Sequence, residues 1–211
     1  MLAKVCGLTN AADADFAAAE GADYLGFVVH PPSPRHCKDL AGASRGVRDR
    51  AVLVTVADDA ELILRLASAA GIRTIQPYVS RDHRAEVVQR LKSEGYFILL
   101  PWVEDRDQEA LQVDFHIWES NPKETGVEGG SGRTHGMDYP PPGPFFLAGG
   151  LDAENLRECT ALMPSESRIR LQGFDAASRL ELSPGIKEPL KVRAFIQTAK
   201  AIAGEVSHAR D

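Results

Sequence analysis

Eight short runs rich in Val, Ile, Leu and Phe recur along this chain, and their spacing restricts the fold more than any other feature. They lie at 2–6, 24–29, 51–56, 72–76, 96–103, 114–118, 145–148 and 169–176. Most are nearly continuous apolar runs, which is typical of parallel strands covered on both faces. Helix-like segments separate many of them, at 10–20, 58–70, 81–94, 152–163 and 189–203. This alternation of strand and helix predicts an α/β fold.

Two α/β architectures fit the alternation, an open doubly wound sheet and a closed (β/α)8 barrel, the TIM barrel. The count of eight strands favours the barrel. A chain of 211 residues, 44% of them hydrophobic, suits one domain that spans residues 1–211. The segment 105–112 has room for barely two helical turns, and the prolines of "YPPPGP" at 139–144 exclude a helix interior. We therefore predict a compact barrel with some truncated helices.

Charge and cysteine content limit the partners and the compartment. The net charge of -6 is spread along the chain, whereas nucleic acid is bound by clustered Lys and Arg. Three cysteines without close pairing or metal-ligand spacing fit a reducing cytoplasm and indicate no zinc site. The most apolar run, at 96–103, is too short to cross a bilayer. We expect a cytoplasmic protein that binds neither nucleic acid nor membrane.

The carboxyl ends of the strands of a barrel meet at one mouth, where such folds carry their chemistry. The residues predicted to lie there are Cys6, Arg35, Gln76, Glu119, Gly149, Gly150, Ser178 and Arg179. A thiol, a carboxylate, a guanidinium group and a glycine pair at one mouth indicate a site for binding and catalysis.

The stretch "FLAGGLDAENL" at 146–156 is the clearest local motif. Its paired glycines, between a strand and a helix, allow backbone amides to approach an anion closely. A plain tight turn is the other interpretation of a glycine pair. The segment "DAASRLELSPG" is expected beside it, because phosphate sites of barrels are usually shared by the loops after strands seven and eight. Phosphate is the ligand that these loops favour.

Four stretches together resemble the phosphoribosylanthranilate isomerase family of tryptophan biosynthesis. They are "KVCGLTNAADADFAAAEGADYLGFVVHPPSPR", "GGSG", "FLAGGLDAENL" and "GFDAASRLELSPGIKEPLKVRAFI", and the resemblance covers essentially the whole chain in the same order. It implies a (β/α)8 barrel and an Amadori rearrangement of N-(5-phosphoribosyl)anthranilate to 1-(2-carboxyphenylamino)-1-deoxyribulose 5-phosphate. This is an intramolecular oxidoreduction of the aldose-ketose type, and the resemblance implies no metal or cofactor for it. The family contains monomers and homodimers.

The resemblance also implies roles for single residues. Cys6 takes the place of the general base and Glu119 that of the general acid, where the family has an aspartate. A free cysteine without the flanking motif would more often be a buried packing residue. Arg35 matches the arginine that holds the anthranilate carboxylate, a task suited to a planar bidentate donor.

The remaining matches concern the phosphate, the fourth strand and a loop. Gly149, Gly150 and Ser178 match the phosphate site, with Arg179 as a further donor beside them. Gln76 is retained at the end of the fourth predicted strand, and the "GGSG" at 129–132 matches a loop that closes over substrate.

Departures from the family keep a second hypothesis open. The family's "QLHG" reads "QPYV" at 76–79, the phosphate turn reads Ala177-Ser178-Arg179, and the end of strand five reads "LLPWV". The alternative is a diverged barrel that binds a sugar phosphate or acts on a related substrate. The barrel isomerase of histidine biosynthesis fits less well, because that family is built on paired aspartates where this chain has Cys6 and Glu119.

Overall fold

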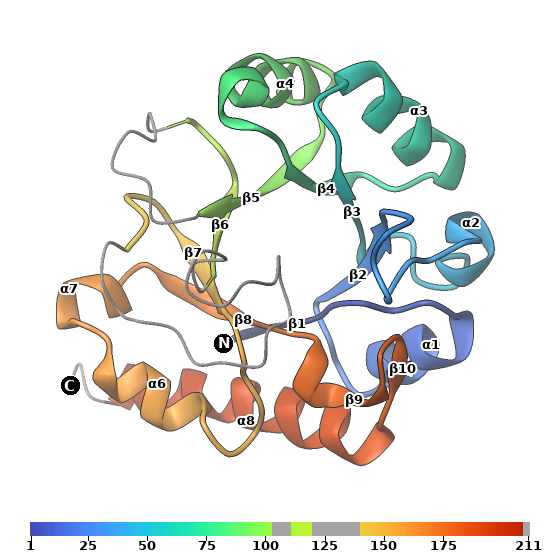
Figure 1. Ribbon diagram of the computed structural model, residues 1–211. Helices are drawn as coiled ribbons and strands as arrows, with labels where there is room; N and C mark the ends of the chain where they lie inside the picture. Colours follow the sequence, from blue (N-terminus) through green and yellow to red (C-terminus); the bar gives the residue numbers. More distant parts are fainter. Residues whose placement is uncertain (103–110, 120–139, 209–211) are drawn as a thin grey trace.

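The computed structural model describes residues 1–102, 111–119 and 140–208, and in this part of the chain eight parallel strands close into a barrel in sequence order (Figure 1). The strands are β1 (Leu2–Val5), β2 (Tyr24–Val29), β3 (Ala51–Val56), β4 (Thr74–Tyr78), β5 (Phe97–Trp102), β6 (Phe115–Trp118), β7 (Phe145–Ala148) and β8 (Leu171–Ala176). β8 pairs with β1, which closes the ring. The prediction of a (β/α)8 barrel is confirmed.

Helices surround the ring, with α3 and α4 on one side and α8 on the opposite side (Figure 1). They are α1 (Ala11–Ala19), α2 (Leu40–Ala43), α3 (Ala60–Ala70), α4 (Arg81–Ser93), α6 (Leu156–Leu162), α7 (Ser165–Arg168) and α8 (Pro189–His208). The four-residue α2 and α7 were not predicted, nor were the 3-10 turn η1 (Ser178–Leu180) and the hairpin of β9 (Glu181–Ser183) and β10 (Ile186–Lys187). Among the helices in the described ranges, none is long and apolar enough to cross a membrane.

Helix boundaries follow from side-chain caps. Asn10 begins α1 by accepting a hydrogen bond from the backbone N–H of Asp13 at 2.9 Å. Asp59 caps α3, and Gly71 ends it in the left-handed conformation at φ 69°. The helix predicted at 152–163 is shorter in the structure, because the Asp152 carboxylate holds residues 152–155 in a turn by accepting from the N–H groups of Glu154 and Asn155.

Strand β4 ends two residues later than predicted. The predicted apolar run stopped at Gln76, and the next residue is a proline, which lacks an N–H donor for the sheet. In the structure Pro77 pairs with Thr55 and Tyr78 with Val56, so the strand continues. Tyr78 therefore stands at the carboxyl end of β4.

The two-residue period of the strands separates the core into two parts. Ala3 and Val5 of β1 pack toward the helices, whereas Cys6 belongs to a smaller cluster inside the barrel. Val52, Val54, Leu99, Ile117, Phe146 and Ala148 complete this inner cluster. The same alternation turns Lys4 inward, where it meets Asp175 of β8. The packing of the strands thus decides which polar groups reach the barrel mouth.

We expect Gly173→Ala to destabilise the barrel by about 3 kcal/mol, the upper range for overpacking. An added Cβ would overlap the carbonyl oxygen of Leu2 and lie 2.7 Å from Cε1 of Phe146. Backbone cannot move aside as a flexible side chain can. Gly143→Ala is the matched control, because its Cβ would lie 3.5 Å from His116, an ordinary contact. Urea unfolding of both variants checks this, and equal midpoints would contradict it.

Candidate active site

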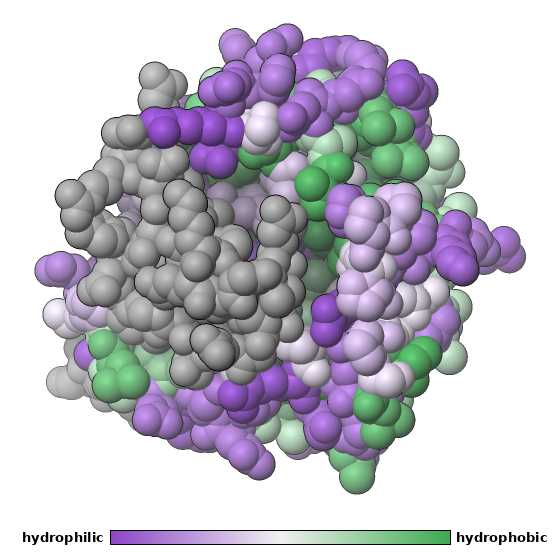
Figure 2. All heavy atoms as spheres, viewed as in Figure 1, coloured by the Kyte–Doolittle hydropathy of each residue, from purple (hydrophilic) through white to green (hydrophobic). Residues whose placement is uncertain are grey.

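A pocket of about 440 Å³ opens at the carboxyl ends of the strands. Seven of the eight predicted site residues line it, and they are Cys6, Arg35, Gln76, Glu119, Gly149, Gly150 and Ser178. In the space-filling view hydrophilic residues dominate the outer helices, and more hydrophobic residues are visible in the central hollow (Figure 2). The volume suits a small organic ligand.

Cys6 directly follows β1, and its backbone N–H donates to the carbonyl of Ala176 at 2.9 Å. Burial raises the pKa of the Cys6 thiol, and the negative Asp175 raises it further. The positive charges of Lys4 and Lys187 oppose this rise without cancelling it. A thiol acts as a base in its thiolate form, which a lowered pKa would favour. In the ligand-free protein Cys6 is instead a protonated thiol at neutral pH, with two cations placed to favour its thiolate.

Lys4 and Asp175 form a buried ion pair beneath Cys6. The Nζ of Lys4 donates to Oδ2 of Asp175 at 2.8 Å, and the Lys4 side chain is fully buried. Burial alone would lower the pKa of Lys4, but the charge and the hydrogen bond of Asp175 raise it above its usual value. The Oδ1 atom of Asp175 is buried without a hydrogen-bond partner among the described residues. Asp175 therefore lines the pocket as a carboxylate held by a buried cation that lies behind the pocket wall.

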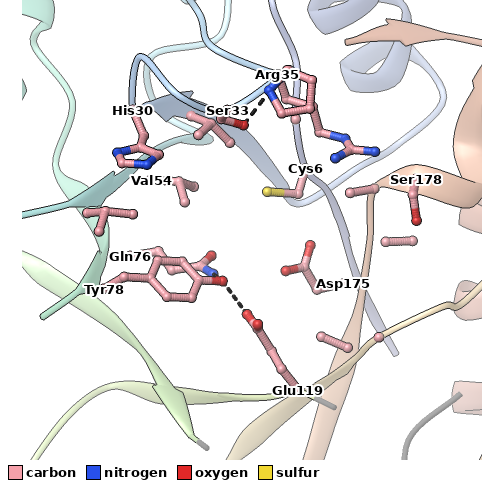
Figure 3. A pocket seen from close by; sticks show the side chains of 18 of the residues that line it. Cys6, His30, Ser33, Arg35, Val54, Gln76, Tyr78, Glu119, Asp175 and Ser178 are labelled. Carbon is pink, nitrogen blue, oxygen red and sulfur yellow. Dashed lines mark hydrogen bonds between the residues drawn. The ribbon is translucent and has the colours of Figure 1, made fainter. Parts of the chain in front are cut away.

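Glu119 directly follows β6 and faces the same space as Cys6 and Asp175 (Figure 3). Burial raises its pKa to about 7, and the negative Asp175 adds to this rise. A hydrogen bond from the Tyr78 hydroxyl and the charge of Lys4 act in the opposite direction. A carboxyl group with a pKa near 7 can donate a proton at neutral pH.

Arg35 lines the pocket, but its guanidinium is already paired. Its Nε donates to Glu181 at 2.9 Å and its Nη2 at 2.8 Å, and the Lys187 ammonium donates to the same carboxylate at 2.9 Å. Burial opposes ionisation of Glu181, yet Arg35 and Lys187 hold its pKa below the usual value. This cluster fixes the β9–β10 hairpin against the loop after β2. The Nη1 group of Arg35 is not part of the pair.

The loops after β7 and β8 form another part of the pocket wall. Gly149 and Gly150 have φ values of 97° and 61°, which side-chain-bearing residues rarely adopt. The side-chain amide of Asn155 donates to the Gly150 carbonyl at 2.8 Å and fixes this turn. Ser178, at the start of η1, lines the same pocket. The glycine turn and the hydroxyl together form a cradle suited to an anion.

Arg179 lies apart from the other predicted site residues, and its role in phosphate binding stays a prediction. Its Nη1 donates to Oδ2 of Asp152 at 2.8 Å, and its side chain is 41% exposed. It is not among the pocket-lining residues that the structure describes. Arg179 thus links the loops after β7 and β8 from outside. The "GGSG" at 129–132 lies outside the described residues.

Five polar residues near the site were not predicted, and they are Lys4, Tyr78, Asp175, Glu181 and Lys187. Lys4 lies two residues before Cys6, and Asp175 lies two residues before Ala177. Because side chains two residues apart in a strand share a face, the sequence could have predicted that both point into the barrel. Tyr78 was missed because the predicted strand ended before it. Glu181 and Lys187 lie on a hairpin that the sequence pattern did not indicate.

The chain has the architecture of a (β/α)8-barrel enzyme. The carboxyl-terminal mouth of its barrel carries a thiol, a carboxyl group of raised pKa and an anion cradle. Residues 3–198 match the family model described as N-(5'phosphoribosyl)anthranilate (PRA) isomerase, and the chain belongs to this family.

Individual relatives agree with this assignment. The chain is 33% identical to the N-(5'-phosphoribosyl)anthranilate isomerase of Azorhizobium caulinodans, over 94% of this chain and 91% of that protein. It is also 33% identical to the enzyme of that name from Deinococcus radiodurans, over 93% of this chain and 95% of the relative. The crystal structure of phosphoribosyl anthranilate isomerase from Thermus thermophilus superposes with a TM-score of 0.73 at 26% identity, covering 96% of this chain and all of that one.

Proposed function

We propose that this chain is a phosphoribosylanthranilate isomerase that converts N-(5'-phosphoribosyl)anthranilate to its 1-deoxyribulose 5-phosphate isomer. The observation that carries the proposal is that Cys6 and Glu119 face one pocket from β1 and β6, with the anion cradle at its end. The family membership supports the same substrate. The single domain, the monomeric or dimeric state and the cytoplasmic location stay predictions.

Glu119 supplies the proton for ring opening. Its carboxyl group donates to the ring oxygen of the ribose, the bond from that oxygen to C1 breaks, and the anilino nitrogen shares its electron pair with C1. The product of this step is an open-chain iminium ion and a carboxylate. The raised pKa of Glu119, about 7, keeps a sufficient fraction protonated at neutral pH.

Cys6 takes the proton from C2 of the iminium ion. The electron pair of the C2–H bond forms a C1–C2 double bond, and the nitrogen becomes neutral. The resulting enol then loses its hydroxyl proton and gains a proton at C1, which gives the ketone. C1 is reduced and C2 oxidised within one molecule, so the proton transfers balance without an external oxidant or reductant.

Thiolate formation at Cys6 is favoured by the surrounding cations. Lys4 and Lys187 lower the free energy of the thiolate, and the positive iminium ion adds to them when it forms. The raised pKa of Cys6 in the free protein therefore falls when the reaction needs the base. Asp175 fixes Lys4 in place through the 2.8 Å ion pair.

The pocket offers separate sites for the two ends of the substrate. The phosphate fits the turn of Gly149 and Gly150 with the Ser178 hydroxyl. Val28, Pro32 and Val54 provide apolar surface for the aromatic ring at another part of the pocket wall. We assign the anthranilate carboxylate to the Nη1 of Arg35, whose other nitrogens are held by Glu181.

The second candidate is a barrel that binds a sugar phosphate without isomerising it. Two observations favour it, the occupation of Arg35 by Glu181 and the raised pKa of Cys6. It predicts that a sugar phosphate raises the melting temperature of a protein that shows no turnover.

We expect the purified protein to consume N-(5'-phosphoribosyl)anthranilate, measured as loss of substrate fluorescence, with a bell-shaped dependence of kcat/KM on pH. The form with one proton shared between Glu119 and Cys6 is the productive one. Its population rises with pH through the Glu119 pKa of about 7 and falls through the higher Cys6 pKa. Absence of turnover at every pH would contradict the proposal. An inflection near the ordinary carboxyl pKa would contradict the role of Glu119.

A further inference from the structure

We propose that Tyr78 is a positioning residue that holds the acidic group of Glu119 in place and that Gln76 orients the Tyr78 hydroxyl for this task. The inference rests on the proposed function, because it assigns the support of the proposed acid. It concerns three side chains that line one pocket, two on β4 and one at the end of β6.

Geometry carries the proposal. The Tyr78 hydroxyl donates to Oε1 of Glu119, as the dashed line in Figure 3 marks. β5 lies between β4 and β6 in the barrel, so this bond joins two strands that do not pair with each other. A glutamate has three side-chain torsions, and a bond at its end removes much of that freedom. The carboxyl group is thereby held toward Asp175 and Cys6.

Gln76 determines the direction of the bond. Its Nε2 donates to the Tyr78 oxygen at 3.1 Å. Since a phenol carries one proton, a Tyr78 oxygen that accepts from Gln76 has its proton available for Glu119. Gln76 is only 1% exposed, so solvent does not compete for this amide. The three groups form a donor chain from the strand wall to the acid.

The charged surroundings of Glu119 show how the chain acts on its proton. Asp175 on β8 raises the Glu119 pKa, and Lys4 on β1 lowers it. Cys6, which follows β1, is a neutral thiol in the free protein because burial raises its pKa. Burial and Glu119 raise the pKa of Tyr78 well above its usual value, so the phenol stays a donor. Its hydrogen bond favours the carboxylate and keeps the Glu119 pKa from rising further.

The decisive experiment is a pH titration of Glu119 in the ligand-free protein. Glutamate labelled with ¹³C at Cδ reports the ionisation by NMR, and the resonance is assigned by its loss in Glu119→Gln. We expect a midpoint near 7 in the unmodified protein and a clearly higher midpoint in Tyr78→Phe. Tyr24→Phe is the matched control, because Tyr24 lies in β2 outside the described pocket lining, and its midpoint should equal that of the unmodified protein.

Kinetics provide the second readout. We expect Tyr78→Phe to lower kcat by between about tenfold and a hundredfold, because a misplaced acid reacts more slowly. The lower inflection of the kcat/KM profile should move to higher pH with the NMR midpoint. In Glu119→Asp the shorter side chain no longer reaches the Tyr78 hydroxyl. Adding Tyr78→Phe to that variant should therefore lower kcat only slightly further.

The outcomes separate the two proposals. A titration midpoint in Tyr78→Phe equal to that of the unmodified protein overturns the role of Tyr78, whether or not the protein is an isomerase. An unmodified protein without turnover overturns the proposed function, while the NMR titration still decides the Tyr78–Glu119 contact. If Tyr78→Phe lowered kcat equally in the unmodified protein and in the Glu119→Asp variant, Tyr78 would act only through general packing, which would also overturn the inference.

Discussion

Replacing Cys6 with alanine is expected to lower kcat for N-(5'-phosphoribosyl)anthranilate by about 10³-fold or more, while the fold is retained. General base catalysis typically contributes about 10²–10⁴-fold, and the described pocket wall offers no second thiol to take the C2 proton. Asp175 lies nearby but is tied to Lys4, so it is poorly placed to replace the base. Loss of substrate fluorescence under single-turnover conditions measures the effect.

The chain contains matched controls for this substitution. Cys37 and Cys159 are also buried free cysteines, but neither lines the pocket. Cys37→Ala and Cys159→Ala each remove a buried thiol that lies outside the pocket. They should lower the free energy of unfolding, because they leave a cavity, but keep kcat within about twofold.

Two further measurements separate a base from a packing residue. Phosphate should raise the melting temperature of Cys6→Ala as much as that of the unmodified protein, because the anion cradle is unchanged. Cys6→Ser restores most of the volume, but its hydroxyl is a far weaker acid than a thiol, so this variant should remain nearly as slow as the alanine variant. Wild-type turnover in Cys6→Ala or Cys6→Ser would show that Cys6 only fills space.

The barrel could be predicted from the sequence because each strand is recognisable from its own short stretch of residues. Eight apolar runs reveal their burial by composition alone, and every run overlaps an observed strand. Cys6 and Glu119 could be predicted because each directly follows a strand, and all strands of a barrel end at the same mouth. Neither prediction depends on the conformation of a side chain or on which charged groups form ion pairs.

The partners of these groups could not be predicted, because they depend on distances between strands remote in sequence. Lys4 and Asp175 are 171 positions apart yet 2.8 Å from each other. Arg35 was expected to be free for a ligand, and Glu181, 146 positions away, accepts hydrogen bonds from its Nε and Nη2. The sign of the Cys6 pKa shift depends on these same groups. Burial and cations have opposite effects on a thiol, and only the structure shows that burial has the larger effect.

Replacing Glu119 with glutamine is expected to lower kcat by about 10²–10⁴-fold with little change in KM. Glutamine has the same length, and its oxygen can still accept the Tyr78 hydrogen bond, so the substitution removes the transferable proton and leaves the shape of the pocket. Glu94→Gln is the control, because Glu94 makes an exposed ion pair with Arg90 on α4, and its kcat should be unchanged.

Glu119→Asp completes the test of the acid. It keeps the carboxyl group but moves it back by one methylene, and a shift of about 1 Å can cost about a hundredfold in rate. The aspartate variant should therefore be faster than the glutamine variant and slower than the unmodified protein. If glutamine and aspartate were equally slow, length and not acidity would matter at position 119. If the glutamine variant kept the unmodified rate, ring opening would need another acid, and the raised pKa of Glu119 would reflect burial alone.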